Sequence, residues 1–281
     1  MTTYNSKTRL EEMATRIRLD IMDMVEQAGS GHIDSSFSCV EIMATLYGNI
    51  MHHDPLNPDA PDRDRFILSK GHAAPTLYAT LARHGYFDAT EFSTLRRLNS
   101  RLQGHPKRGL PGIEVNTGSL GQGLSIASGL AVGLSRRATG TPSRVFALLS
   151  DGELNEGQVW EALMFAGHQH LGNLTAIVDG NGLQYSGKTH DVSNLSGFGT
   201  AVKALGWTYA EVDGHSPDEL LKAFRRRHPN KPLLIFAHTT KGKGGLFLEN
   251  DLVWHGKVPD SQRLATLRDH LQQQLAEISN A

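Results

Sequence analysis

The chain has 281 residues, enough for one large α/β domain or two small ones with a substantial buried core. Its 28 Lys and Arg against 29 Asp and Glu give a net charge of −1, so the charge balance favours neither nucleic acid nor an anionic membrane as a partner. The single cysteine, Cys39, excludes an intramolecular disulfide and lies among apolar neighbours typical of a buried position. No secretory signal or membrane-spanning apolar run is recognisable, so we expect a cytoplasmic protein.

The first part of the chain is predicted to be mainly helical. Apolar residues spaced three and four apart predict a helix that includes 10–24 and ends near Gly29. Three further elements are expected here: a helix over 40–47, a short buried strand over 66–68 and a helix over 75–84. The stretch 101–118 is rich in glycine, proline and charge, which indicates an ordered functional loop.

The next predicted helix, 119–137, has an unusually large share of small residues. Gly121, Gly123 and Ala127 lie on one side of it, with Ser128 and Ala131. Glycine in a helix costs up to about 1 kcal/mol relative to alanine, so this composition needs a reason. The reason is either close approach of another backbone or a cofactor, or simple tight packing within the domain.

From residue 145 onwards, strands and helices alternate. The expected strands are 145–149, 174–178, 207–212 and 233–237, and the expected helices are 155–170, 217–227 and 264–278. This alternation predicts an α/β fold with a mostly parallel sheet and helices on both faces. Ligands of such folds bind beyond the carboxyl ends of the strands. With no internal repeat or linker, residues 1–281 are expected to form one domain.

Two polar segments, 150–153 and 179–183, each follow one of these strands directly. Asp151 and Asn181 are about one βαβ unit apart, so both side chains should lie at the same end of the sheet. A hard divalent cation bound to a diphosphate prefers a carboxylate, an amide oxygen and a carbonyl oxygen. Taken alone, Asp151 is better explained as a helix N-cap, a position that aspartate favours. The pair nevertheless favours a metal-diphosphate site.

This pair resembles the thiamine-diphosphate signature, and the run 151–162 strongly resembles the transketolase family. More specifically, it is similar to the N-terminal, diphosphate-binding subunit of split, two-gene transketolases. The resemblance implies the thiamine-diphosphate-binding fold and a Mg²⁺ ion (or Ca²⁺ or Mn²⁺) held by Asp151, Asn181 and the carbonyl oxygen of Leu183. It also implies that Gly152 and Glu153 form the turn that contacts the diphosphate.

Three separate loops carry His32, His72 and His105 and resemble histidine loops that line the active site of this family. The resemblance implies that they are catalytic, with His32 and His72 orienting oxygens of the donor substrate. It assigns His105 to the substituents of the substrate's carbonyl carbon. An imidazole suits these tasks because it can donate a hydrogen bond and transfer the proton.

Two more loops match the family. The stretch 116–123 resembles the loop beside the cofactor, which implies that Gly118 and Leu120 bind thiamine diphosphate. The stretches 241–244 and 254–256 resemble a late loop that closes over the diphosphate, where a basic side chain suits the negative charge. There the resemblance assigns His255 both a catalytic and a cofactor-binding role.

Three positions depart from the pattern or stay open. Ser150 stands where the family usually has glycine. Glu156 either faces the partner's pyrimidine-binding domain, as the resemblance implies, or is an exposed charge at a helix start. Asp34 stands where small uncharged residues are usual, and it either alters the accepted sugar or caps the following helix.

The resemblance covers nearly the whole chain and implies a transketolase-type transferase. Such an enzyme transfers a two-carbon ketol unit from a ketose, often phosphorylated, to an aldose. The glutamate that activates the cofactor is expected on a partner chain carrying the pyrimidine-binding and C-terminal domains, in an α2β2 or homodimeric assembly. The alternatives are the α subunit of a 2-oxo acid dehydrogenase and a non-catalytic cofactor-binding subunit.

Overall fold

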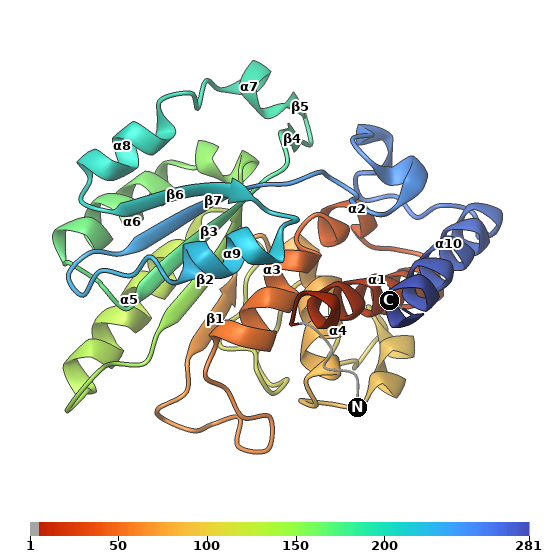
Figure 1. Cartoon of the computed structure of the whole chain (residues 1–281), viewed down its shortest axis with the longest axis horizontal. Helices are drawn as coiled ribbons and strands as arrows, with labels where there is room; N and C mark the ends of the chain where they lie inside the picture. The colour runs from red at the N-terminus through yellow and green to blue at the C-terminus, as the bar shows by residue number, and fades with distance from the viewer. Residues whose placement is uncertain (1–5, 281) are drawn as a thin grey trace.

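A five-stranded parallel sheet forms the centre of the fold (Figure 1). The computed structural model describes residues 6–280. The strands lie in the order β1 (Arg65–Leu68), β2 (Val145–Ser150), β3 (Leu174–Gly180), β7 (Leu233–His238) and β6 (Thr208–Asp213). Every neighbouring pair in this sheet is parallel. The predicted fold class is therefore confirmed.

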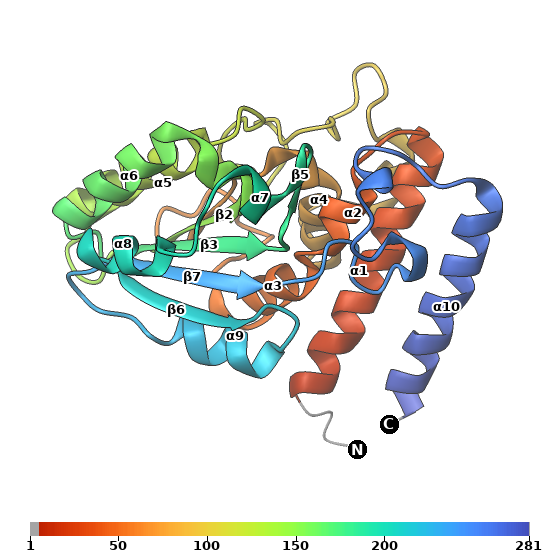
Figure 2. The same ribbon diagram turned by 90° about the horizontal axis from the view of Figure 1, so that it is seen from above.

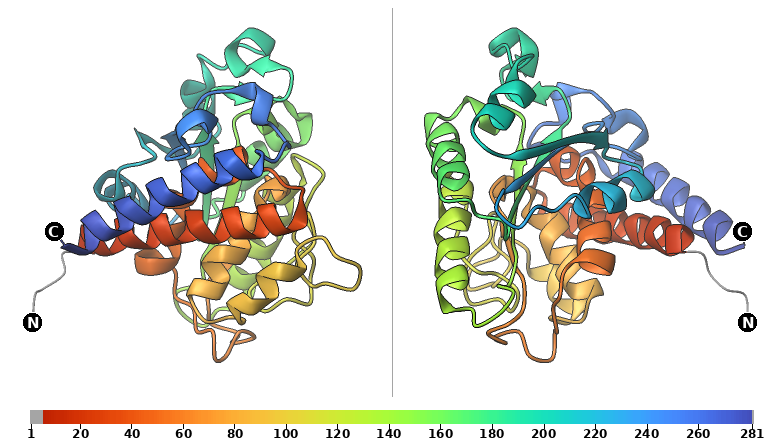
Figure 3. Two further views of the ribbon diagram at one scale, coloured as in Figure 1. Left: turned by 90° about the vertical axis from the view of Figure 1, so that its right-hand side faces the viewer. Right: turned by 60° about the vertical axis from the view of Figure 1, so that its left-hand side comes forward.

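Helices cover both faces of the sheet because successive residues of a strand point to opposite sides. In β2, Phe146 and Leu148 pack into one apolar core, whereas Val145, Ala147 and Leu149 pack into the other. Figure 3 shows the two layers. The first core is covered by α1 (Ser6–Ala28), α3 (Val40–Thr45), α4 (Ala74–Arg83) and α9 (Pro217–Phe224). The second is covered by α5 (Gln122–Arg137), α6 (Gly157–His168) and α8 (Phe198–Ala204).

The last helix, α10 (Ser261–Asn280), lies along α1 on the side away from the sheet (Figure 2). Buried leucines of α10 fill the seam: Leu264, Leu267 and Leu271. At the exposed edge of this seam, Arg268 of α10 forms ion pairs with Asp23 and Glu26 of α1. Both long helices were predicted from their apolar spacing, and both form.

Several element boundaries differ from the predicted ones for local reasons. The helix expected from 119 begins at Gln122, because Gly121 adopts a left-handed conformation with φ +86°. The helix expected from 155 begins at Gly157, because a 3₁₀ turn (Gly152–Asn155) comes first and Glu156 is extended. The helix expected over 40–47 ends at Thr45 and continues as a π-helical turn (Leu46–Ile50).

Several short elements were not predicted. They are α2 (Ile33–Phe37), the antiparallel hairpin β4 (Leu183–Gln184) and β5 (Gly187–Lys188), and α7 (Thr189–Val192). The remaining short 3₁₀ helices are Gly71–Ala73, Ala89–Thr94, Leu246–Leu248 and Leu252–Trp254. Elements of two to six residues carry too little periodicity to be recognised in a sequence. Several of them lie at the carboxyl end of the sheet.

Cys39 is completely buried, as predicted, and burial raises the pKa of its thiol to about 11. The thiol is therefore protonated at neutral pH and acts as a small packing group. In the part of the chain that the structure describes, no helix has the length and apolar character needed to cross a membrane.

Candidate active site

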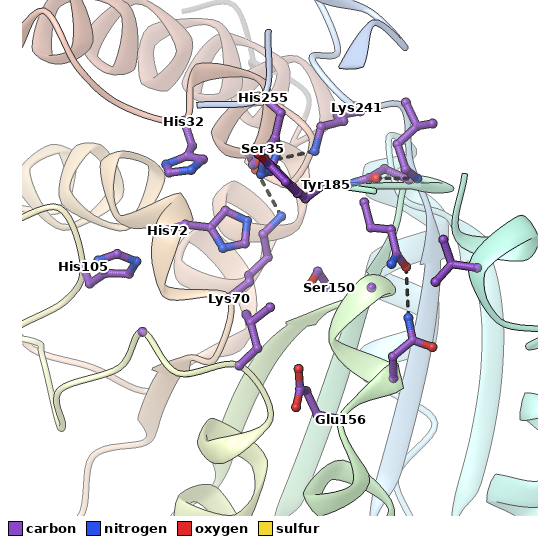
Figure 4. A pocket seen from close by; sticks show the side chains of 18 residues that line it. His32, Ser35, Lys70, His72, His105, Ser150, Glu156, Tyr185, Lys241 and His255 are labelled. Carbon is purple, nitrogen blue, oxygen red and sulfur yellow. Dashed lines mark hydrogen bonds between the residues drawn. The ribbon is translucent and has the colours of Figure 1, made fainter. Parts of the chain in front are cut away.

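A cavity of about 430 Å³ lies at the carboxyl ends of four neighbouring strands (Figure 4). Its walls include Lys70 after β1, Ser150 at the end of β2, Asn181 after β3 and Lys241 after β7. Most residues that the sequence assigned to catalysis and cofactor binding line it: His32, His72, His105, Gly118, Leu120, Gly152, Glu156, Asn181, Leu183 and His255. The loops that carry these residues lie far apart in the chain, and the parallel sheet brings them together.

Asp151 lies just beneath this cavity and is almost completely buried. Its Oδ1 accepts a hydrogen bond from the Gly152 amide at 2.8 Å. Its Oδ2 accepts from the Gly182 amide at 2.6 Å and from the Thr189 hydroxyl at 3.0 Å. Burial and the nearby Asp179 carboxylate raise the pKa of Asp151. Its hydrogen-bond partners within the described residues are all neutral, which leaves its negative charge suited to a cation.

Asn181 and Leu183 lie beside Asp151 because Ser150 and Asp179 are paired in register at the ends of β2 and β3. The Asn181 Oδ1 accepts a hydrogen bond from the Leu183 amide at 3.1 Å, which fixes the turn after β3. The side chains of Asp151 and Asn181 and the backbone of Leu183 thus place one carboxylate, one amide and one carbonyl group close together. Among residues 6–280 there is no group of three or more His, Cys, Asp or Glu placed to hold a metal ion.

Glu153 does not line the cavity, unlike Gly152 beside it. Its carboxylate is completely buried and accepts hydrogen bonds from the Ser69 hydroxyl, the Gly121 amide at 2.6 Å and the Ser150 amide at 3.2 Å. Burial raises the pKa of this carboxyl group. The Glu153 side chain therefore joins three loops behind the cavity, and within this turn Gly152 is the residue exposed to a ligand.

Three histidine rings meet at the inner end of the cavity. The ring centroids of His32 and His72 are 5.2 Å apart, and those of His32 and His255 are also 5.2 Å apart. Burial, with His255 nearby, lowers the pKa of His32 to about 4, and burial lowers that of His72 well below its usual value. Burial and Arg96 lower the pKa of His105. The imidazoles of His32, His72 and His105 are neutral at pH 7, so each can donate one hydrogen bond and accept another.

Sequence reasoning missed two lysines as site residues. Lys70 belongs to the loop in which only His72 was singled out, yet it is one of the residues around the cavity, and its completely buried ammonium group pairs with Asp179. In the late loop, Lys241 lines the cavity and donates to the Ser35 hydroxyl at 3.1 Å. Lys243, in contrast, lies outside the cavity near Glu249. The signal for Lys70 was its place beside His72.

Further lining residues come from elements that were not predicted. Gln184 and Tyr185 belong to the β4–β5 hairpin, and Val192 ends α7. The Tyr185 ring is 5.7 Å from the His255 ring, although 85% of the Tyr185 residue surface is exposed. The hairpin therefore forms one edge of the cavity mouth.

Asp34 was expected either to reach the substrate pocket or to cap the following helix, and the structure shows neither. It does not line the cavity, and its side chain makes no capping hydrogen bond at the start of α2. Instead, it is buried behind two lining residues, with its carboxylate 3.3 Å from the Lys241 ammonium nitrogen.

The sheet, the buried carboxylate beside an amide, and the neutral histidines define an α/β protein with a polar cavity at the carboxyl ends of its strands. The family described as "Transketolase, thiamine diphosphate binding domain" matches residues 10–277. The chain therefore belongs to the transketolase family and contains its thiamine-diphosphate-binding domain.

Similar proteins from several organisms are also named as transketolases or transketolase subunits. The chain is 41% identical over 249 residues to the 6-deoxy-6-sulfo-D-fructose transketolase subunit SqwG of Clostridium sp., covering 88% of this chain and 90% of that protein. It is 38% identical over 256 residues to a subunit of the apulose-4-phosphate transketolase of Phocaeicola vulgatus, with 90% coverage of each. Human transketolase is 42% identical over 248 residues, which cover 88% of this chain but 40% of the human protein.

Solved structures show the same relationship. The transketolase of Campylobacter jejuni superposes with a TM-score of 0.88 at 28% identity, covering 98% of this chain and 46% of that one. A Pichia stipitis transketolase variant solved with fructose 6-phosphate gives a TM-score of 0.85 at 29% identity, over 98% of this chain and 45% of that one. This chain thus corresponds to the N-terminal, thiamine-diphosphate-binding part of a transketolase, and a 2-oxo acid dehydrogenase subunit is not favoured.

Proposed function

We propose that this chain acts with a separate partner subunit to transfer a two-carbon ketol unit from a ketose to an aldose. The partner would carry the pyrimidine-binding domain and the glutamate that activates the cofactor. The observation that carries the proposal is one cavity lined by Asn181 and three neutral histidines, with the Asp151 carboxylate buried just beneath it. Two relatives are named as transketolase subunits, and the match to this chain covers 90% of the length of each, which supports a two-chain enzyme.

A divalent cation, Mg²⁺ or else Ca²⁺ or Mn²⁺, would be held by Asp151, the Asn181 side chain and the Leu183 carbonyl oxygen. The fit rests on the burial of Asp151 and on its purely neutral hydrogen-bond partners in the described chain. Gly152, Gly118, Leu120 and His255 line the same cavity and would contact the cofactor. A hard cation with oxygen ligands suits a diphosphate.

Thiamine diphosphate supplies the carbon nucleophile for this class of reaction when it is bound. The chain's own residues would bind the substrate and move protons. Neutral His32 and His72 can hold oxygens of the donor sugar, and His105 can contact the substituents of the carbonyl carbon. Because burial keeps them uncharged near pH 7, each ring can donate a proton at one nitrogen and accept one at the other.

The assembly and its surroundings belong to the same proposal. Glu156 is exposed at the edge of the cavity, where it can face the partner's pyrimidine-binding domain in an α2β2 or homodimeric assembly. Residues 1–281 would act as one domain, and the substrate would be a sugar or a sugar phosphate. A cytoplasmic location stays a prediction from the sequence.

Titration calorimetry with thiamine diphosphate tests the cofactor site. We expect binding in the presence of Mg²⁺ and its loss with EDTA. Asp151→Asn should weaken Mg²⁺-dependent binding at least tenfold, since Asp151 is the only charged side chain among the three proposed protein ligands. Asp88→Asn, a change at an exposed helix cap, is the matched control.

Activity is then assayed with the co-purified partner and a panel of ketose phosphates. Binding without turnover in the complex would favour the non-catalytic cofactor-binding subunit. Absence of metal-dependent binding, with or without the partner, would overturn the enzyme proposal. Full activity of the isolated chain would overturn the proposed division of the site between two subunits.

A further inference from the structure

Asp34 is a completely buried carboxylate in the short helix α2. Neither of its oxygens has a hydrogen-bond partner among the described residues. Burial of a charged group without compensation is costly, so such a residue needs a reason to stay ionised. Its neighbours in the cavity wall supply that reason.

Two nitrogen-bearing side chains face the same carboxylate oxygen. The Lys241 ammonium nitrogen is 3.3 Å from Asp34 Oδ2, and the His255 Nδ1 is 3.5 Å from it. Burial by itself would raise the pKa of Asp34, but His255 and Lys241 outweigh burial and lower it. At neutral pH the carboxylate is therefore negative. It lies directly behind Lys241 and His255, which both line the cavity.

The two nitrogens of His255 are in different surroundings. Its Nδ1 is shut off from solvent and lies on the Asp34 side, while the ring itself lines the cavity and contacts the rings of His32 and Tyr185. A neutral imidazole carries one proton, and a carboxylate beside one nitrogen selects the tautomer with the proton there. The 3.5 Å separation is long for a hydrogen bond, but catalytic contacts often shorten when a ligand binds.

We propose that Asp34 is a positioning residue that keeps the proton of His255 on Nδ1, so that Nε2 presents a free lone pair to the cavity. An imidazole held in this way accepts a hydrogen bond, so it recognises an O–H group of the ligand and not a carbonyl oxygen. The same carboxylate compensates the charge of Lys241. The inference rests on the proposed function only for the identity of the ligand, a polyhydroxylated sugar.

The tautomer can be measured without cofactor, substrate or partner. A long-range ¹H–¹⁵N correlation spectrum of the ¹⁵N-histidine-labelled full chain distinguishes a protonated from an unprotonated Nδ1. The His255 signals are assigned by their loss in His255→Gln. We expect the Nδ1–H tautomer in the wild type, whereas free neutral histidine in water favours the Nε2–H form. An Nε2–H tautomer or a doubly protonated ring in the wild type would overturn the proposal.

The variant Asp34→Asn should shift His255 towards the Nε2–H form. Glu249→Gln is the matched control, because Glu249 lies in the same late loop but faces Lys243, outside the cavity. An unchanged His255 spectrum in folded Asp34→Asn protein would contradict the proposal. If this variant does not fold, the wild-type spectrum still decides, and Asp34→Asn/Lys241→Met removes both buried charges together.

A kinetic experiment on the complex with the partner subunit tests the consequence for recognition. With fructose 6-phosphate as donor, Asp34→Asn should raise KM about three- to tenfold, the range expected for one hydrogen bond, with a smaller change in kcat. Wild-type KM in this variant would overturn the role in recognition. Failure of thiamine diphosphate to bind would refute the proposed function and leave the tautomer result standing.

Discussion

Lys70 and Asp179 form an ion pair in which neither side chain has any exposed surface. Asp179 is the last residue but one of β3, next to the turn that carries Asn181, and its carboxylate also accepts hydrogen bonds from Ser38 and Thr239. Burial alone would raise the pKa of Asp179, but Lys70 and these hydrogen bonds lower it. The pair joins the loop after β1 to the end of β3 beside the cavity.

Removing one member of this pair should destabilise the protein strongly. Lys70→Met leaves the Asp179 carboxylate buried without its cation, which costs about 3–5 kcal/mol in comparable cases. Urea unfolding of the isolated chain measures the loss. The double variant Lys70→Met/Asp179→Asn should recover part of it, because no uncompensated charge remains. Arg101→Met, which breaks the exposed pair with Glu91, is the control and should change little.

Stability should also fall in acid because of Glu41. Burial would raise the pKa of this carboxyl group, but Arg18 and His215 outweigh it and lower the pKa from 4.5 to about 2. Since the folded state binds the proton more weakly than the unfolded state, the contribution is complete above pH 4.5 and disappears as the pH falls towards 2. A shift of this size corresponds to about 3 kcal/mol.

Urea unfolding between pH 7 and pH 3 measures this contribution. Glu41→Gln should lose stability at pH 7 and show a shallower decline below pH 4.5 than the wild type. The salt bridge to Arg18, at 2.6 Å, is the interaction being tested. Parallel pH profiles for the two proteins would refute the assignment.

The glycines of α5 should respond to alanine in opposite ways. A Cβ added at Gly123 would lie 2.7 Å from the Ser69 Cα, so Gly123→Ala should cost about 1–3 kcal/mol through overpacking. Gly129 has no atom within 4 Å of such a Cβ, so Gly129→Ala should stabilise the isolated chain by up to about 1 kcal/mol.

Thermal and urea unfolding of both alanine variants give the comparison. This comparison tests one explanation for the small residues of α5, namely that Gly123 is required for tight packing against Ser69. Equal effects at the two positions would contradict this explanation.

His32 should stay neutral far below the usual range for histidine. Burial, with His255 nearby, lowers its pKa to about 4. The ¹H–¹³C spectrum of the isolated chain should therefore show no titration of the His32 ring between pH 8 and pH 5.5, with N-acetylhistidine amide as the internal reference. Because a cationic His32 is absent in this range, the profile of kcat/KM should have no limb from this residue above pH 5. A midpoint near 6.5 for His32 would contradict the burial of this ring.

The sequence predicted the parts of this molecule that depend on repeating patterns. The strands β2 and β3 followed from their apolar runs, and the meeting of Asp151 with Asn181 followed from parallel strand ends. The helices α1 and α10 followed from apolar spacing. These features are fixed by local periodicity and by the geometry of one βαβ unit, which a single sequence carries openly.

What the sequence did not predict depends on contacts between distant segments. Asp34 meets residues more than two hundred positions later, and no local pattern indicates that pairing. Lys70 lies in a motif in which only the histidine was predicted to belong to the site. Its partner, Asp179, is in β3, more than one hundred residues later in the chain. The β4–β5 hairpin has two residues per strand, too few for an alternating pattern. In each case the feature depends on tertiary contacts, which a single sequence does not reveal.

The cavity walls span residues 32 to 255 and include the loops after four strands. A ligand that fills them therefore holds together nearly the whole chain and not a single loop. At a concentration one hundred times its Kd, it would add about 2.7 kcal/mol to the free energy of unfolding. The cofactor should thus protect the chain from proteases along most of its length, so a shortage of thiamine is expected to shorten the lifetime of the protein as well as to lower its activity.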